Sequence, residues 1–287
     1  MTSAAAPPAL EDHQRRYAEF ARLHATPALV LPNAWDVASA RVIEEAGAQA
    51  IATTSAGVAW SLGAPDGNAV DRADALAVVA RIARAVGVPV SADIETGFGE
   101  THAELAETIR AVLDAGAVGI NIEDSGFAPL RPLEEQVARL GVVRATARAA
   151  GRSLFINARI DTYLMAAGDP ADRLGETVRR SAAYLAAGAD GIFVPGVTDP
   201  AILRQLVAAI PAPLNVLTGP GAPTIAELAE LGVRRISAGS SIAQAAYALA
   251  RRAARELLTT GTYDELVREL DYAELNRLVG ARPSALG

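Results

Sequence analysis

Residue types that often carry chemistry are scarce or missing in this chain of 287 residues. It has no cysteine, all 26 of its basic residues are arginine, and its three histidines are His13, His24 and His102. The missing lysine excludes a Schiff base, and the missing cysteine excludes a thiol nucleophile, a disulfide and a thiolate metal site. Dispersed histidines do not build a His/Cys zinc cluster either. Chemistry is left to carboxylates, arginines, hydroxyls, amides and a metal held by oxygen.

Long apolar runs and an excess of positive charge are also missing. No apolar stretch approaches the roughly 20 residues of a membrane span. The formal net charge is −7, which argues against a nucleic-acid-binding surface. Residues 1–10 are rich in Ala and Pro without a basic start, so we expect a disordered N-terminus and no signal peptide. The sequence therefore predicts a cytoplasmic protein with neither membrane nor nucleic acid as a partner.

Short apolar, β-branched runs recur along the chain and predict strands. Near-continuous apolar strands of this kind are typical of parallel sheets that are covered on both faces. The runs are Ala28–Asn33, Ala50–Ser55, Val88–Glu95, Val118–Asp124, Leu154–Asp161, Gly191–Val197, Pro213–Thr218 and Arg234–Gly239. Segments with helical periodicity separate them, among them Asp71–Val86, Thr101–Ala115, Leu133–Ala150 and Pro170–Ala187.

Glycines mark the places where the predicted helices end. Gly47, Gly116, Gly188 and Gly232 each precede a predicted strand and suit a helix C-terminus. Strand–helix units in this order predict a (β/α)8 TIM-type barrel, with a doubly wound open sheet as the alternative. No linker divides the chain, so we expect one domain over residues 11–287.

Additional helices are predicted at both ends of the barrel. Glu11–His24 precedes the first strand and is expected to plug the bottom of the barrel. Ile242–Leu258 and Tyr263–Val279 follow the last strand. They form a C-terminal helical region over about residues 242–279.

Acidic residues gather where the second, third and fourth predicted strands end. Asp93 and Glu95 share one face of the third strand, Glu123 ends the fourth, and Asp66 follows the second. Active sites of these barrels lie at the carboxyl ends of the strands. Carboxylates so close together repel one another unless a cation lies among them, and oxygen ligands favour Mg²⁺, with Mn²⁺ as a substitute. Pairing of these acids with arginines is the alternative.

The fifth predicted strand adds an arginine and an amide to the same rim. Asn157, Arg159 and Asp161 alternate along it and therefore share a face. A guanidinium there suits a substrate carboxylate or phosphonate. The alternative is that Arg159 pairs only with Glu123 or Asp161.

Several weaker candidates lie in the loops. Thr53-Thr54-Ser55-Ala56-Gly57 offers hydroxyls and backbone N–H groups to an anion, and Trp35 either walls the pocket or packs under a loop. Gly219-Pro220-Gly221 and Gly239-Ser240-Ser241 are alternative phosphate-binding segments. Asn215 on the seventh strand is a further substrate-binding candidate.

These motifs, taken in order, resemble the isocitrate lyase/phosphoenolpyruvate mutase superfamily. The resemblance covers about Val30 to Ser240. The matching segments are Pro32-Asn33-Ala34-Trp35-Asp36, Thr54-Ser55, Pro65-Asp66-Gly67, Asp93-Ile94-Glu95-Thr96-Gly97-Phe98-Gly99, Ile122-Glu123-Asp124 and Asn157-Ala158-Arg159-Ile160-Asp161. Asp93-Ile94-Glu95 stands where the family usually shows Asp-x-Asp, and it keeps both carboxylates.

The resemblance implies a site and an assembly. Asp66, Asp93, Glu95 and Glu123 would hold Mg²⁺ directly or through water, residues 55–57 would bind one end of a 2-oxo or 2-hydroxy acid, and Arg159 would bind an anionic group. The family also implies a homo-oligomer, a dimer of dimers, in which C-terminal helices are swapped between subunits.

Two departures separate this sequence from the well-known branches of the family. Its segment 125–133 lacks the Lys-x-Cys-Gly-His stretch of lyases on isocitrate-like acids and the Lys and Asn-Ser of phosphonopyruvate enzymes. Gly196 stands where 2-methylisocitrate-type lyases usually present Glu. The resemblance therefore implies a divergent branch.

The sequence hypothesis is a Mg²⁺-dependent lyase that cleaves or forms a C–C bond in a small 2-oxo or 2-hydroxy carboxylate through a metal-bound enolate. A phosphonopyruvate-type mutase or hydrolase is one alternative, and a non-catalytic barrel that binds a carboxylate metabolite is the other. The general acid/base is left open among Ser55, Tyr163, Asp36, Asp161 and metal-bound water.

Overall fold

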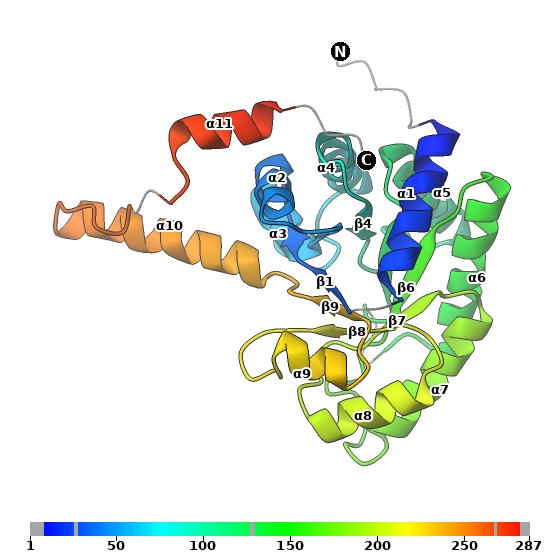
Figure 1. Cartoon of the computed structure of the whole chain (residues 1–287). Helices are drawn as coiled ribbons and strands as arrows, with labels where there is room; N and C mark the ends of the chain where they lie inside the picture. Colours follow the sequence, from blue (N-terminus) through cyan, green and yellow to red (C-terminus); the bar gives the residue numbers. More distant parts are fainter. Residues whose placement is uncertain (1–8, 26–27, 127–129, 267–268, 282–287) are drawn as a thin grey trace.

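The computed structural model describes residues 9–25, 28–126, 130–266 and 269–281. Parallel strands form a barrel at its centre, and helices lie around it (Figure 1). The strands are β1 (Leu29–Leu31), β2 (Asn33–Ala34), β3 (Ile51–Thr53), β4 (Val90–Asp93), β5 (Gly119–Glu123), β6 (Phe155–Arg159), β7 (Gly191–Phe193), β8 (Leu214–Leu217) and β9 (Arg235–Ser237). Each predicted run contains a strand, so the predicted strand pattern is confirmed.

Helices alternate with these strands along the chain and follow the last one. They are α1 (Leu10–Leu23), α2 (Val37–Glu45), α3 (Ser55–Ser61), α4 (Arg72–Ala85), α5 (His102–Ala115), α6 (Leu133–Ala149), α7 (Arg173–Ala186), α8 (Pro200–Ala209), α9 (Ile225–Glu230), α10 (Ser241–Thr259) and α11 (Tyr272–Gly280). No helix of the described segments combines the length and the apolar composition that a membrane span needs.

The barrel closes through its first strand, which Pro32 divides into β1 and β2. β1 pairs with β9, Leu29 opposite Arg235, while β2 pairs with β3. Proline has no N–H to donate to a neighbouring strand, and the ladder changes partner there. Since both ends of the strand order meet in one continuous segment, the fold is the predicted TIM-type barrel, and the open sheet is wrong.

Apolar and polar side chains occupy different layers of the barrel. Ile120 and Ile122 of β5 pack outward against helix residues such as Leu105 and Leu140 in the main core. The alternate residue, Asn121, points to the interior, because its side chain bonds to Asn157 on the next strand. This polar interior lies directly beneath the carboxyl ends of the strands.

Helix α1 closes the opposite end of the barrel, as predicted. Phe20 is fully buried, and its ring packs edge-on against Phe155 with 5.5 Å between ring centroids. Gly119 leaves the space for it, since a Cβ at that position would lie 2.7 Å from the Phe20 ring. The bottom of the barrel is therefore sealed, and access is from the carboxyl ends.

The predicted helix ends agree with the structure except near the C-terminus. Gly47, Gly116, Gly188 and Gly232 all have positive φ, between 93° and 107°. The helix predicted over Tyr263–Val279 was wrong in its start, because α11 begins at Tyr272, where the Asp271 side chain accepts from the backbone N–H of Glu274 at 2.7 Å. The predicted disordered start, apart from residues 9 and 10, lies outside the described residues, as do residues 127–129 of segment 125–133.

Candidate active site

A cavity of about 210 Å³ opens among the carboxyl ends of the strands. This volume is below the roughly 300–1,000 Å³ of pockets for drug-sized ligands, so it suits a small molecule. Of the predicted site residues, Ser55, Ala56, Asp66, Asp93 and Arg159 line it. The other lining residues are Asn33, Thr54, Asn121, Leu164, Phe193, Pro195, Leu217, Ser237, Gly239 and Ser240.

Asp93 ends β4 at the floor of this cavity. Its carboxylate accepts the backbone N–H of Ser55 at 3.3 Å, where α3 begins, and it also bonds to the Ser55 hydroxyl. Burial raises the pKa of Asp93, the nearby charge of Arg159 opposes that rise, and Asp66 adds to it. Asp93 and Asp66 thus form an acidic corner that a cation would stabilise.

Glu95 connects two loops of the rim. Its backbone has φ of 51°, a left-handed conformation that is uncommon for a residue with a side chain. Its carboxylate accepts the backbone N–H of Asn68, and the Asn68 side chain in turn accepts the Thr96 hydroxyl at 3.0 Å. Burial raises the pKa of Glu95 to about 7, with Asp93 and Asp66 adding to the rise. Glu95 therefore holds the loop that carries Asp66.

Arg159 is fixed between two carboxylates at the end of β6. Its Nη1 lies 2.6 Å from Glu123 Oε2, and its Nε and Nη2 donate to Asp161 at 2.7 and 3.0 Å. Burial raises the pKa of Glu123 to about 7, which Arg159 opposes. Burial also disfavours the arginine's charge, yet Glu123 and Asp161 raise the pKa of Arg159 above its ordinary value. The guanidinium stays charged and cannot turn freely.

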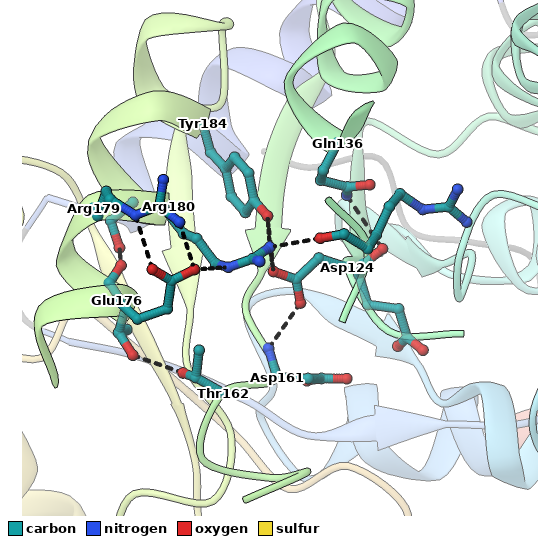
Figure 2. A network of polar contacts seen from close by, with 12 residues as sticks. Asp124, Gln136, Asp161, Thr162, Glu176, Arg179, Arg180 and Tyr184 are labelled. Carbon is teal, nitrogen blue, oxygen red and sulfur yellow. Dashed lines mark hydrogen bonds and ion pairs between the residues drawn. The ribbon is translucent and has the colours of Figure 1, made fainter. Parts of the chain in front are cut away.

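A second buried cluster surrounds Asp124, and Figure 2 shows its polar contacts. Asp124 is fully buried, and its carboxylate accepts from the Tyr184 hydroxyl at 2.8 Å and from Arg180 at 3.0 Å. Its other oxygen accepts the backbone N–H of Asp161 at 3.0 Å. We call this the outer cluster. It positions the loop of Asp161, whose carboxylate accepts the hydrogen bonds of Arg159.

Asparagines form the layer beneath the cavity. The Asn157 amide donates to Asn121 at 2.8 Å and to Asn215 at 3.0 Å. Arg235 lies deeper and donates to Asn121 at 3.1 Å, while its Nε and Nη1 have no hydrogen-bond partner among the described residues. Burial lowers the pKa of Arg235 to about 9, and Asp93 opposes the change. Asn157 and Asn215, predicted to bind substrate, thus lie under the cavity and support its floor.

Other predicted site residues lie outside the cavity lining. The Asp36 carboxylate accepts the Ser39 backbone N–H at 2.7 Å and caps α2, while Tyr163 stacks on Arg173. Trp35 lies beside Tyr247 of α10, with ring centroids 6.4 Å apart. Gly57 sits so tightly that a Cβ there would come within 2.8 Å of Trp35 Cβ. Of the two glycine segments, only Gly239-Ser240 reaches the cavity, and Gly221 lines a separate groove.

Several lining residues were not predicted from the sequence. Asn121 is two residues before Glu123 on β5, so strand alternation places it on the same face and could have identified it. Leu164 and Leu217 carry no comparable signal, because isolated leucines near strand ends resemble ordinary core residues.

A metal ion in this site would be coordinated directly by few protein side chains. Among the described residues, no three acidic or imidazole groups converge closely enough to enclose an ion. Asp66 and Asp93 nevertheless line one cavity, and their charges act on each other. Mg²⁺ commonly keeps several waters and binds through one or two carboxylates, so this pair fits it.

Sequence comparisons identify relatives across most of the chain. A family model described as phosphoenolpyruvate phosphomutase matches residues 20–258. An uncharacterised protein of Mycobacterium tuberculosis (strain CDC 1551 / Oshkosh) is 41% identical over 251 residues, which cover 87% of this chain and 92% of that protein. The 2-methylisocitrate lyase of Escherichia coli K12 is 31% identical over 61% of this chain and 60% of its own length. An oxaloacetate decarboxylase of Ectopseudomonas mendocina is 32% identical over 69% of this chain and 67% of that enzyme.

Solved structures share the whole architecture. A protein of Burkholderia cenocepacia J2315 has a TM-score of 0.88 at 38% identity, covering 96% of this chain and 99% of its own. The 2,3-dimethylmalate lyase, a superfamily member, has a TM-score of 0.81 at 28% identity, covering 92% and 95%. With the family model spanning most of the barrel, these matches show that the chain belongs to the isocitrate lyase/phosphoenolpyruvate mutase superfamily of enzymes.

Proposed function

We propose that the enzyme is a lyase that cleaves or forms a C–C bond in a small 2-oxo or 2-hydroxy carboxylate. One observation carries the proposal: a small cavity combines the acidic pair Asp66 and Asp93 with the fixed guanidinium of Arg159. Relatives named 2-methylisocitrate lyase and oxaloacetate decarboxylase support carbon–carbon chemistry next to a carboxylate.

The acidic corner is the proposed binding place for Mg²⁺, or for Mn²⁺ in its stead. Asp66 and Asp93 would hold the ion, while Glu95 holds the Asp66 loop and Glu123 orients Arg159. A divalent ion bound there would supply electrophilic stabilisation of negative charge on the substrate. Clustered carboxylates with raised pKa values are the groups that such an ion would keep ionised.

The chain's own residues would bind and orient the acid. Ser55 and Ala56 face the cavity at the start of α3, where the Ser55 hydroxyl and the Ala56 backbone N–H suit one end of a carboxylate. Arg159 is preorganised by Glu123 and Asp161, so it stabilises charge that develops on a substrate oxygen without first reorganising.

Proton transfer is assigned to Ser55. Its hydroxyl is bonded to Asp93, which orients it, and Ser55 lines the cavity within reach of a bound substrate. Asp36 and Tyr163 are left out of this role, because Asp36 caps a helix and neither lines the cavity.

Calorimetry with Mg²⁺ and a turnover assay test the proposal together. Asp66→Asn and Asp93→Asn should abolish or strongly weaken Mg²⁺ binding, whereas exposed Glu134→Gln on α6 should leave it unchanged. Wild-type protein should release a 2-oxo acid from a 2-hydroxy dicarboxylate with Mg²⁺ present. Undiminished binding in both variants would refute the metal assignment, and absence of turnover with binding intact would favour a non-catalytic barrel.

Phosphorus–carbon chemistry is the second candidate, because the matching family model is described as phosphoenolpyruvate phosphomutase. Phosphonopyruvate as the only substrate separates the two. A mutase yields phosphoenolpyruvate and a hydrolase yields pyruvate with phosphate. Neither product is expected if the enzyme is the proposed carbon–carbon lyase.

The proposed assembly is a homo-oligomer built through the C-terminal helices. α10 extends away from the barrel (Figure 1), and Leu258 near its end is 86% exposed. Tyr247 on the same helix contacts Trp35 and Trp60 beside the site.

α11 lies on α2 of its own chain, where Arg41 donates to the Leu278 carbonyl at 2.8 Å. Light scattering should show a mass above the monomer, reduced in Leu258→Glu; exchange of these helices between subunits stays a prediction.

A further inference from the structure

The cavity is polar on one side and apolar on the other. Polar or charged residues come from β9, β2, β3, β4, β5 and β6, which are consecutive around the barrel and end at Arg159. The remaining arc follows β7 and β8, where Phe193, Pro195 and Leu217 face the cavity beside Leu164 of the loop after β6. We name these four residues the apolar wall.

The apolar wall offers no charge to a ligand. Among the described lining residues, Arg159 is the single cation, and its guanidinium is already engaged by Glu123 and Asp161. It also stacks on Phe193, 5.9 Å from the ring centroid. A ligand carboxylate directed at β7 and β8 would lose its hydration without gaining a partner.

Leu164 is the most exposed member of the wall. It is 45% exposed although it lines a cavity whose neighbouring residue Phe193 is 5% exposed. A bound apolar group would remove this surface from water, which is favourable.

Gly196 fixes the position of Leu164. Its φ is +87°, and a Cβ there would lie 2.9 Å from the Leu164 backbone nitrogen and 3.1 Å from the Tyr163 carbonyl carbon. The segment that carries Leu164 therefore packs directly on a glycine backbone. A side chain at 196 would push this segment away from its place.

From this geometry we propose that the apolar wall determines specificity: the substrate carries a short alkyl substituent against these four residues and no carboxylate on that side. The inference rests on the proposed function and names the substrate class of the same site. It predicts preference for 2-oxo or 2-hydroxy acids with an alkyl group against the apolar wall over acids that place an additional carboxylate there. Leu164 is the residue whose replacement should change that preference most, since it is the exposed member of the wall.

Calorimetric titration of the full-length protein with Mg²⁺ tests this inference without requiring turnover. The probes are pyruvate, 2-oxobutanoate, 2-oxopentanoate and 2-oxopentanedioate. The last two have the same carbon chain and differ by a terminal carboxylate. Affinity should rise about tenfold or more from pyruvate to 2-oxopentanoate, since each methylene in an apolar pocket contributes severalfold. The dicarboxylate should bind at least about tenfold more weakly than 2-oxopentanoate because of its unpaired charge.

Leu164→Arg should reverse the order of the matched pair by supplying a cation to the wall. Met165→Arg is the control, because Met165 is 54% exposed on the next position and does not line the cavity. If the wild-type protein binds the acids with equal affinity, or with affinity that falls as the alkyl chain lengthens, this inference fails while the proposed function stands. If none of the four acids binds, both fail.

Discussion

Glu123 and Asp124 are neighbours in the sequence and belong to two different carboxylate–arginine clusters. Glu123 pairs with Arg159, which lines the cavity, whereas Asp124 pairs with Arg180 and Tyr184, as Figure 2 shows. Asp161 belongs to both, since its carboxylate accepts from Arg159 and its backbone N–H donates to Asp124.

Both clusters pair an arginine with carboxylates, but they differ in burial and therefore in function. The outer cluster is sealed by helices, with Asp124 fully buried and Arg180 8% exposed, so no small molecule reaches it. The inner arginine lines a cavity and can meet a ligand. Burial with complete pairing indicates a structural role, and pairing beside a cavity indicates a preorganised functional group. Substitutions should separate these roles as changes in stability or in activity.

The largest expected effect is the loss of the outer arginine. Arg180→Met leaves the Asp124 carboxylate buried without its cation, which should lower the free energy of unfolding by about 3–5 kcal/mol. Urea unfolding followed by circular dichroism measures this change. A loss below about 1 kcal/mol would contradict the structural role of the cluster.

Arg159→Lys should affect activity more than stability. The lysine keeps a charge but cannot hold Asp161 with two parallel hydrogen bonds, so the group loses its fixed orientation. We expect kcat/KM to fall about 100-fold or more, the size seen when one preorganised donor is removed. A stability loss as large as that of Arg180→Met, with activity retained per folded molecule, would show that the two clusters do not differ.

His24 is a buried ionisable group, and no carboxylate is among the described residues that shift its pKa. Burial lowers its pKa to about 3, Arg235 adds to the fall, and the hydrogen bond from Nδ1 to the Phe20 carbonyl opposes it. Between about pH 3 and 6.5 the unfolded chain binds more protons at His24, so its contribution to stability falls as pH decreases.

The comparison of wild type with His24→Phe isolates this contribution. Glu95 and Glu123 have raised pKa values and act in the opposite direction in both proteins, so their effects cancel in the difference. From about pH 7 to 5, wild type should lose about 2 kcal/mol more than the variant. Equal pH profiles would show that His24 titrates alike when folded and unfolded.

The smallest effect is expected for Arg179→Met. Arg179 binds the same Glu176 as Arg180 does, but its side chain is 57% exposed. Exposed pairs contribute little because water screens them, so the loss should stay below about 0.5 kcal/mol. The same urea unfolding measures this change in the free energy of unfolding. A decrease close to that of Arg180→Met would mean that burial does not distinguish the ion pairs of the two arginines.

Most of the fold could be predicted because its signals are local. Apolar runs of strand length and glycines such as Gly116 and Gly188 repeat along the chain, and each is determined by short-range geometry. The helix predicted from Tyr263 failed because periodicity continues through the turn before Asp271, where only the cap marks the true start.

The candidate site was predictable where strand alternation applies. Asp93 and Arg159 follow from their places at the ends of strands. The partners of Arg159 were left open in the sequence, because ion pairing depends on side-chain orientation across strands. Leu164 could not be predicted, since its position depends on the close approach of its loop to Gly196, which is remote in sequence.

The division of the first strand at Pro32 has a consequence for biosynthesis. Leu29 leaves the ribosome early, yet its partner Arg235 is one of the last barrel residues to be made. Until then the strands form an open arc whose two edges expose unpaired backbone groups, a template for aggregation. A chain that stops before β9 therefore leaves both β1 and β8 without their neighbour, so nascent chains of this protein should depend on protection of these edges until synthesis is nearly complete.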